Sequence, residues 1–237
     1  MIAATRAVTD RLDFISGLEE ILFDKDLKKR TKERSQLHRI LASETWIFRE
    51  EYALTADDNT LKTALRAHVK LLGEDGVSID SDDEVLDSEG RRVVVDLILS
   101  KVIEQHANRR DNIVIELKRP SKTIGMTEFT QIQNYAATVI RDDRFASTNA
   151  NWEFWVIGDN IDDSVNLMVN QDGREPGIAV LAKNYTVRVL TWASVLSDAK
   201  HRLKFVQKAL EYQSRQERGV EYLRETHGKY VADILRP

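Results

Sequence analysis

The sequence predicts an α/β protein with a mixed sheet flanked by helices, and two patterns of apolar residues support this prediction. In several short stretches apolar and polar residues alternate, which is the period of a half-buried strand. In other stretches apolar residues recur every three or four positions, which is the period of an amphipathic helix. The sequence contains no internal repeat, and no flexible linker divides it. We therefore expect one sheet with helices packed against it.

The composition indicates a soluble protein. The 237 residues suffice for one large domain, or for a domain with appendages. Because the chain has no cysteine, disulfides, zinc ribbons and thiol catalysis are excluded, and a reducing compartment such as the cytoplasm is expected. No apolar run approaches the roughly 18 residues of a membrane span, and several charges lie among the first 30 residues, where a signal peptide would be apolar. We expect no membrane partner.

The charge is unevenly distributed along the chain. The net charge is −4, and residues 74–89 contain eight acids and no base. Residues 25–39 contain seven basic residues against two acids, and residues 200–237 contain nine against five. Basic surfaces beside an acidic site suit a metal-dependent enzyme that acts on a polyanion, although solvated helix faces would give the same pattern.

The first part of the chain is predicted to contain helices, a strand and a loop. Residues 1–30 have helical spacing, and a second helix is expected from Thr31 to Ser43. The segment Trp46–Leu54 alternates apolar with charged residues and is predicted to be a strand. Helical periodicity returns from Asn59 to Leu72, and residues 73–90 are expected to form an acidic loop with short strands.

The centre of the sequence holds two apolar runs, Val93–Leu99 and Ile113–Leu117, and each run contains an acid. If the runs pair as an antiparallel hairpin that turns near His106, Asp96 lies opposite Glu116, with the Cβ atoms about 5 Å apart. Alternation places each acid on a face that also carries apolar residues. Like charges that face each other destabilise a sheet, so this pair needs an explanation.

A half-buried carboxylate without a partner costs several kcal/mol, so we expect a cation at this pair, either Lys118 or a divalent metal. Oxygen ligands favour a hard ion such as Mg²⁺ or Mn²⁺. The alternative is an ordinary charge pair of Glu116 and Lys118 on an edge strand, with Asp96 as a solubilising residue at a strand end. Asp96 weakens this alternative because it interrupts its apolar run in the middle.

A helix is expected from Thr127 to Ile140, after Pro120 has ended the preceding strand. Gln131 and Tyr135 lie four residues apart on one face of this helix, and Glu128 lies a turn earlier on nearly the same face. These three residues could face the paired acids. They could equally form a helix face with a half-buried tyrosine.

The rest of the chain is predicted to contain two further strands and two helices. The strands are Trp152–Ile157 and Tyr185–Leu190, with a loop at residues 173–177 between them. Thr191 is a suitable N-cap for a long helix that follows, and residues 217–237 show weaker helical periodicity.

Several well-known motifs are absent from the sequence. It contains neither a dinucleotide-binding G-x-G-x-x-G after a strand, nor a P-loop, nor a G-x-S-x-G nucleophile turn. Its five histidines do not have metal-ligand spacing, and surface or capping roles are expected for them. The carboxylates remain as the candidates for chemistry.

The order and spacing of these residues resemble the PD-(D/E)XK nuclease superfamily. Asp96 is followed after 19 residues by Glu116-Leu117-Lys118, and then by a helix that bears Gln131-x-x-x-Tyr135. The Q-x-x-x-Y element is similar to one in the RecB-like branches of the superfamily.

Three segments resemble, more narrowly, the Shedu anti-phage defence nucleases; they are Glu33–Phe48, Ile113–Pro120 and Lys200–Phe205. The resemblance implies a restriction-endonuclease-like αβββαβ core with helices on both faces and extra N- and C-terminal helices. It divides the chain into an N-terminal helical segment (1–30), a nuclease domain (31–212) and a C-terminal helical tail (213–237). It further implies a cytoplasmic homo-oligomer that cleaves DNA in prokaryotic defence against phage.

A metal-dependent DNA endonuclease would use the paired acids as metal ligands. Asp96 and Glu116 would hold Mg²⁺ or Mn²⁺, together with the carbonyl group of Leu117. An upstream glutamate would complete the set, and the sequence leaves Glu33 and Glu44 as alternatives for it.

The other site residues would act on the reaction itself. Lys118 would orient the attacking water or stabilise the growing charge, Gln131 would steady the site or the DNA backbone, and Tyr135 would brace the helix. The alternative function is a catalytically inactive nucleic-acid-binding or scaffold module on the same fold, in which the acids and Lys118 form a buried ion-pair network.

Overall fold

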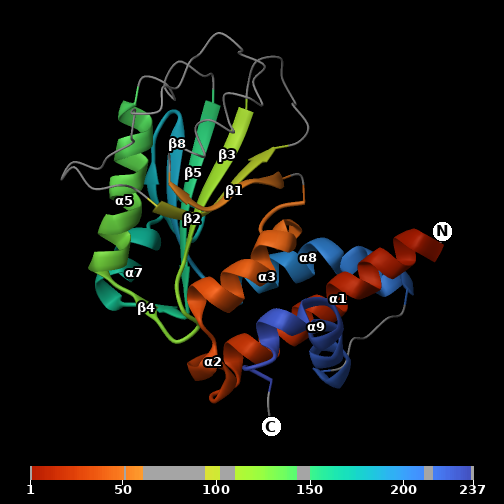
Figure 1. Cartoon of the computed structure of the whole chain (residues 1–237). Helices are drawn as coiled ribbons and strands as arrows, with labels where there is room; N and C mark the ends of the chain where they lie inside the picture. Colours follow the sequence, from red (N-terminus) through yellow and green to blue (C-terminus); the bar gives the residue numbers. More distant parts are fainter. Residues whose placement is uncertain are drawn as a thin grey trace.

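The computed structural model describes residues 2–50, 52–60, 94–101, 110–142, 150–210 and 216–235. Within these ranges the protein has the predicted mixed α/β architecture, with a six-stranded sheet that has helices against both of its faces (Figure 1). The strands follow the order β1-β2-β3-β5-β8-β7 across the sheet. No described helix has the length and apolarity that a membrane crossing requires.

The main sheet is antiparallel at both edges and parallel in the middle. Its strands, in spatial order, are β1 (Tyr52–Thr60), β2 (Val94–Lys101), β3 (Arg110–Leu117), β5 (Ala150–Gly158), β8 (Tyr185–Thr191) and β7 (Ile178–Leu181). β1, β2 and β3 form an antiparallel meander, β3 pairs in parallel with β5, β5 with β8, and β7 returns antiparallel to β8. Two short strands, β4 (Thr123–Ile124) and β6 (Asn160–Ile161), form a separate parallel pair.

The helices divide between the two faces of this sheet. One face is covered by α5 (Met126–Arg141) and α7 (Asp163–Val169). The other face is covered by the remaining helical elements: α1 (Ile2–Phe23), α2 (Leu27–Arg30), the π-helix η1 (Glu33–Leu37), α3 (His38–Ser43), the 3₁₀ helix η2 (Thr45–Ile47), α8 (Trp192–Leu210) and α9 (Gln216–Val231).

Alternation along the central strands separates two apolar cores, as the period of two predicts. On β3, Ile113 and Ile115 belong to the core that includes α1, α3, α8 and α9, whereas Val114 packs with α5 and α7. The strands in the middle of the sheet are thus buried on both faces, and any polar side chain there is withdrawn from water.

The predicted hairpin pairing of β2 and β3 is confirmed. Leu97 lies opposite Ile115 and Ile98 opposite Val114, which is the register that a turn centred on His106 predicts. Continuing this register by one residue places Asp96 across from Glu116. The turn itself lies outside the described residues, as do the predicted helix from residue 61 onwards and the predicted acidic loop.

Helices from the two ends of the chain pack against each other. A side chain at Gly17 on α1 would approach the carbonyl oxygen of Gly219 on α9 to 2.3 Å, so this crossing depends on two glycines. Apolar residues of both helices belong to the same core as Leu97 and Ile115 of the sheet.

Two predicted boundaries are wrong. The strand expected at Trp46–Leu54 begins only at Tyr52, because Trp46 to Phe48 form a compact helical turn whose three successive side chains are all buried. The helix expected from Asn59 cannot begin there, because β1 runs to Thr60. The other predicted helices and strands of the described ranges are present, whereas β4, β6, α7 and β7 were not predicted.

Candidate functional site

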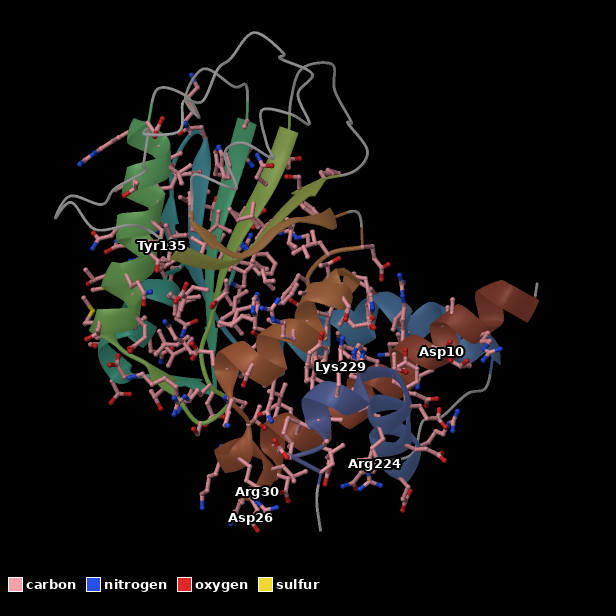
Figure 2. All side chains as sticks on the ribbon, viewed as in Figure 1. Asp10, Asp26, Arg30, Tyr135, Arg224 and Lys229 are labelled. Atoms are coloured by element: carbon pink, nitrogen blue, oxygen red, sulfur yellow. The ribbon has the colours of Figure 1, made fainter. Side chains whose placement is uncertain are left out.

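The end of β3 and the start of α5 bring four predicted site residues into one hydrogen-bond network. The Lys118 ammonium group donates to Glu116 Oε1 at 2.8 Å and to Gln131 Oε1 at 3.0 Å. The Gln131 amide nitrogen donates to Glu116 Oε1 at 2.9 Å and to the Tyr135 hydroxyl group at 2.6 Å. Of the two possibilities that the sequence left open for this helix face, the structure has the one in which Gln131 contacts Glu116 and Lys118, with Tyr135 joined to them through Gln131. Tyr135 packs against the core between α5 and the sheet (Figure 2).

Asp96 is buried in the middle of the sheet, with 4% of its surface exposed. Its carboxylate oxygen Oδ2 accepts a 2.7 Å hydrogen bond from the backbone N–H of Leu117 on β3. The ring nitrogen Nε2 of His38, which is fully buried on α3, lies 2.9 Å from the carbonyl oxygen of Asp96. The aspartate is thus held from both sides, by a neighbouring strand and by a helix.

Burial dominates the electrostatics of the two acids. Burial and, after it, the nearby Asp96 carboxylate together raise the pKa of Glu116 from 4.5 to about 7, against the opposing effect of Lys118. Burial also raises the pKa of Asp96, against the hydrogen bond from the Leu117 N–H group. Two buried carboxylates thus share one lysine, and the site would accept additional positive charge.

The structure distinguishes the two candidates for the upstream glutamate. Glu33, on η1, raises the pKa values of both Asp96 and Glu116, and its carboxylate accepts a 3.0 Å hydrogen bond from the Arg119 N–H group next to Lys118. The Glu44 carboxylate instead binds the Trp46 indole nitrogen at 2.7 Å and lies 3.2 Å from Nε2 of His227. Glu33 is therefore the glutamate whose charge acts on the paired acids.

The donor set suits a hard cation, although the described residues hold no group of three or more His, Cys, Asp or Glu that is already gathered for a metal ion. Asp96 Oδ1 and Glu116 Oε2 accept none of the hydrogen bonds among the described residues, so one oxygen of each acid can serve as a ligand. Glu33 would have to turn from the Arg119 N–H group to join them. Leu117 contributes its N–H group to Asp96, and its fully buried side chain belongs to the core.

Glu128 has a structural role at the start of α5. Its carboxylate accepts the N–H of Gly125 at 3.0 Å and pairs with the Lys122 ammonium group at 2.9 Å. This arrangement satisfies one of the free N–H groups at the helix start and fixes the angle at which α5 leaves β4. The residue lies one turn before Gln131 and supports it without touching it.

The expectation that all five histidines have surface or capping roles is wrong for two of them. His38 is fully buried beside Asp96, and His227 is 4% exposed beside Glu44. The sequence does carry a signal for His38, because it follows Leu37 and precedes Ile40 and Leu41 on the apolar side of its helix. That position identifies a buried residue but not the carbonyl group it contacts.

No family model matches the chain, and comparisons with curated proteins and with solved structures found no match either.

Proposed function

We propose that the protein is a metal-dependent DNA endonuclease of the PD-(D/E)XK type, most similar to the Shedu anti-phage defence nucleases. The observation that carries the proposal is the pair of buried acids, Asp96 and Glu116, on adjacent strands, with Lys118 bound to one of them at the strand end. Burying two carboxylates and a lysine costs folding free energy. We therefore infer that the fold keeps these residues because they have a function.

The order of elements supports the same proposal. The elements follow the αβββαβ order of a restriction-endonuclease-like core, in the series α3, β1, β2, β3, α5 and β5. The first three strands form an antiparallel meander, and β5 pairs in parallel with β3. Asp96 and Glu116 lie on the second and third strands of this series, and Gln131 lies on the helix that follows.

The chain's own residues can be given roles in phosphodiester hydrolysis. A bound Mg²⁺ or Mn²⁺ would neutralise charge on the phosphate and lower the pKa of water, which is the chemistry the side chains cannot supply alone. Asp96 and Glu116 would hold it, with Glu33 and the Leu117 carbonyl group as further ligands. Lys118 would leave Glu116 to orient the water or to stabilise the charge that develops at the scissile phosphate.

Gln131 and Tyr135 act as positioning residues in this proposal. Gln131 contacts both Glu116 and Lys118, so it fixes their separation, and Tyr135 fixes Gln131. Both come from α5, whose start is set by the Glu128 contacts. The catalytic lysine and a metal ligand are thus aligned by one helix face.

DNA as the substrate is favoured by basic residues near the site. Arg119 directly follows Lys118, and Lys32 directly precedes Glu33; both basic residues are exposed. Such residues contact phosphates and carry little sequence information, so we propose a nuclease with weak sequence preference that works in the cytoplasm as a homo-oligomer.

The scaffold alternative is supported by the same network. Glu116, Lys118 and Gln131 satisfy one another, as a purely structural ion-pair network would. A network of this kind would have no use for a divalent ion. Metal binding therefore separates the two functions.

The deciding experiment is plasmid nicking with Mg²⁺ or Mn²⁺, combined with calorimetric titration of Mn²⁺. The wild-type protein should nick DNA, and EDTA should abolish the activity. Lys118→Ala should retain Mn²⁺ binding but lose most of the rate, since one positioned charge-stabilising group contributes about 3 to 4 kcal/mol to barrier lowering. Asp96→Ala should lose Mn²⁺ binding as well. If the wild-type protein neither binds Mn²⁺ nor cleaves any nucleic acid, the scaffold alternative is correct.

A further inference from the structure

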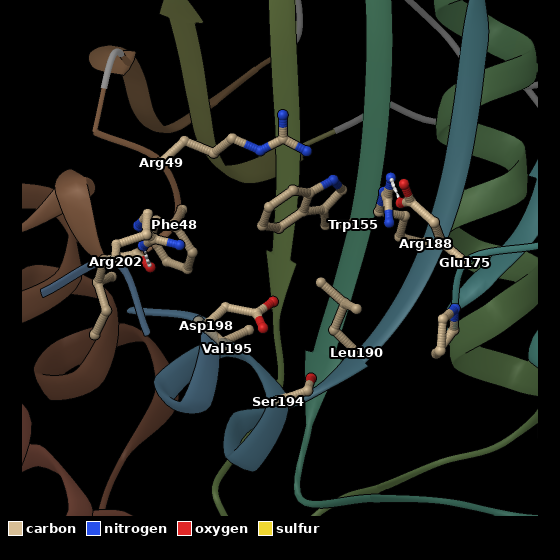
Figure 3. Close-up of a pocket in the computed structure, with 12 residues that line it drawn as sticks. Phe48, Arg49, Trp155, Glu175, Arg188, Leu190, Ser194, Val195, Asp198 and Arg202 are labelled. Carbon is tan, nitrogen blue, oxygen red and sulfur yellow. Dashed lines mark hydrogen bonds and ion pairs between the residues drawn. The ribbon is translucent and has the colours of Figure 1, made fainter. Parts of the chain in front are cut away.

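The fully buried ring of His38 is held by Asp96. Its Nε2 atom lies 2.9 Å from the Asp96 carbonyl oxygen, and its Nδ1 atom has no hydrogen-bond partner among the described residues. Polar groups elsewhere on the same face of the sheet are paired differently: in the cavity between β5, β8 and α8, Arg188 binds the carboxylate of Glu175 at 2.9 Å (Figure 3). The orientation of the His38 ring thus depends on one polar contact, and that contact is with a site residue.

This contact fixes the main chain of Asp96. A carbonyl oxygen can only accept a hydrogen bond, so Nε2 of His38 carries the proton and donates it. The side chain of Asp96 is held separately, because its oxygen Oδ2 accepts the Leu117 N–H group at 2.7 Å. The two hydrogen bonds together determine where the other carboxylate oxygen, Oδ1, lies.

Glu33 is held beside Asp96 at the end of β3. The Leu117 N–H group donates to Asp96, and the Arg119 N–H group, two residues further on, donates to Glu33 at 3.0 Å. Two carboxylates from different elements, β2 and η1, therefore accept alternate N–H groups of one chain segment. Any shift of η1 along this segment changes the distance between them.

Glu33 and His38 begin and close a single π-helical turn. The His38 N–H group donates to the Glu33 carbonyl oxygen, five residues earlier, and the start of the turn is held by Gln36, whose Oε1 atom accepts the Lys32 N–H group at 2.7 Å. A turn closed over five residues places its first and last side chains on nearly the same side, whereas five residues of an α-helix would rotate them about 140° apart. The π turn therefore lets one short segment present both Glu33 and His38 to the site.

We propose that His38 is a positioning residue of the metal site, which fixes the main chain of Asp96 and, through the π turn, the place of Glu33. This inference rests on the proposed nuclease function, because it assigns Asp96 and Glu33 to the metal. His38 itself contacts neither the metal nor the DNA. It acts like the outer groups that orient metal ligands, whose loss typically weakens metal affinity by about 10- to 100-fold.

Calorimetric titration of the intact protein with Mn²⁺ is the first experiment. His38→Leu removes the donor and should weaken Mn²⁺ binding about tenfold or more, whereas His38→Gln keeps an N–H donor and should bind Mn²⁺ nearly as the wild type does. His201→Leu, at an exposed histidine on α8, is the matched control and should change nothing. Unchanged Mn²⁺ affinity in a folded His38→Leu variant overturns the proposal, and so does a His38→Gln variant that binds as weakly as His38→Leu.

The part assigned to the π turn is tested by combining two substitutions. Glu33→Gln alone should weaken Mn²⁺ binding. His38→Leu should then cost less affinity in the Glu33→Gln background than in the wild type, because part of its effect passes through Glu33. Equal fold-changes in the two backgrounds overturn the part assigned to the turn.

Amide hydrogen exchange with EDTA present tests the positioning without metal. Asp96 should hold the Leu117 N–H group less firmly once His38 is removed, so this amide should exchange about tenfold faster in His38→Leu. The neighbouring Lys118 N–H group donates to the Ile157 carbonyl oxygen on β5 at 2.8 Å and should exchange at the wild-type rate. An unchanged rate at Leu117, or an equal acceleration at both amides, overturns the positioning role.

The exchange experiment also separates the two proposals. A wild-type protein that does not bind Mn²⁺ overturns the nuclease function, and the Leu117 amide then decides whether His38 positions Asp96. If His38→Leu does not fold, nitrogen NMR of the wild-type ring decides instead. The proposal requires a proton on Nε2, and a ring protonated only on Nδ1 overturns it.

Discussion

Replacing Glu116 by glutamine should change how the stability of the metal-free protein depends on pH. Glu116 has a pKa of about 7 in the folded protein against 4.5 for the ordinary group, mainly because it is buried. The folded state therefore binds this proton more tightly than the unfolded chain does. The stabilisation is fully present below pH 4.5 and is lost as the pH rises through 7.

The size of the effect follows from the two pKa values. At about 1.4 kcal/mol for each pH unit, the difference corresponds to about 3 kcal/mol of unfolding free energy between pH 4.5 and pH 8, as an upper value. Glu116→Gln should lose this dependence, because the amide group does not titrate in this range.

Urea unfolding of both proteins at several pH values between 4.5 and 8, with EDTA present, measures the effect. The difference in unfolding free energy between variant and wild type should grow in favour of the variant as the pH rises. Glu128→Gln is a matched control of opposite sign, because hydrogen bonds from Lys122 and the Gly125 N–H group outweigh burial and lower the pKa of Glu128. Its loss should remove stability that is present above pH 4.5. A wild type and a Glu116→Gln variant with parallel pH profiles would refute the assignment of a buried, proton-binding Glu116.

Two further predictions concern stability at other positions. At pH values above 7, Asp96→Asn should increase the urea midpoint of the metal-free protein, since it removes a buried charge and keeps an acceptor for the Leu117 N–H group. Asp96→Ala should not increase it, because the Leu117 N–H group then loses its partner at a cost of about 1 to 3 kcal/mol. Equal midpoints for the two variants would show that the hydrogen bond is unimportant. Gly17→Ala should lower the thermal midpoint by the equivalent of about 1 to 3 kcal/mol, because its Cβ would approach Gly219 O to 2.3 Å. Gly228→Ala, on the same helix pair with nothing within 4 Å of the added Cβ, is its control and should be neutral or stabilising, and a similar loss in both variants would contradict the helix-crossing argument.

The sequence was most informative where local periodicity and tertiary structure agree. The β2–β3 register could be predicted because the two apolar runs are symmetric about one position, and the position of Gln131 followed from its place on a helix directly after that hairpin. The segment at Trp46 was mispredicted because alternation of residue types does not distinguish a strand from a tight turn whose successive side chains all enter a core. For α7 a signal was present, since Asp162 caps the helix through the N–H of Val165.

Other features could not be predicted because they depend on residues far apart in the chain. His38 contacts Asp96 across 58 positions, and Glu153 accepts hydrogen bonds from Arg49 and Arg188, which lie 104 and 35 positions away. No spacing rule connects such residues. The preference for Glu33 over Glu44 likewise required the structure. Glu33 lies at the start of one helical stretch and Glu44 directly after its end, and only their hydrogen-bond partners distinguish them.

The crossing of α1 and α9 at Gly17 and Gly219 has a consequence for synthesis of the chain. The two glycines are about 200 positions apart, so at about 5 to 20 residues per second roughly 10 to 40 seconds pass between their translation. During that interval the apolar side of α1, including Phe14 and Leu18, lacks the helix that covers it in the folded protein. A nascent chain of this protein is therefore expected to expose the apolar side of α1 until α9 has left the ribosome, and so to be a client for chaperones that bind exposed apolar segments.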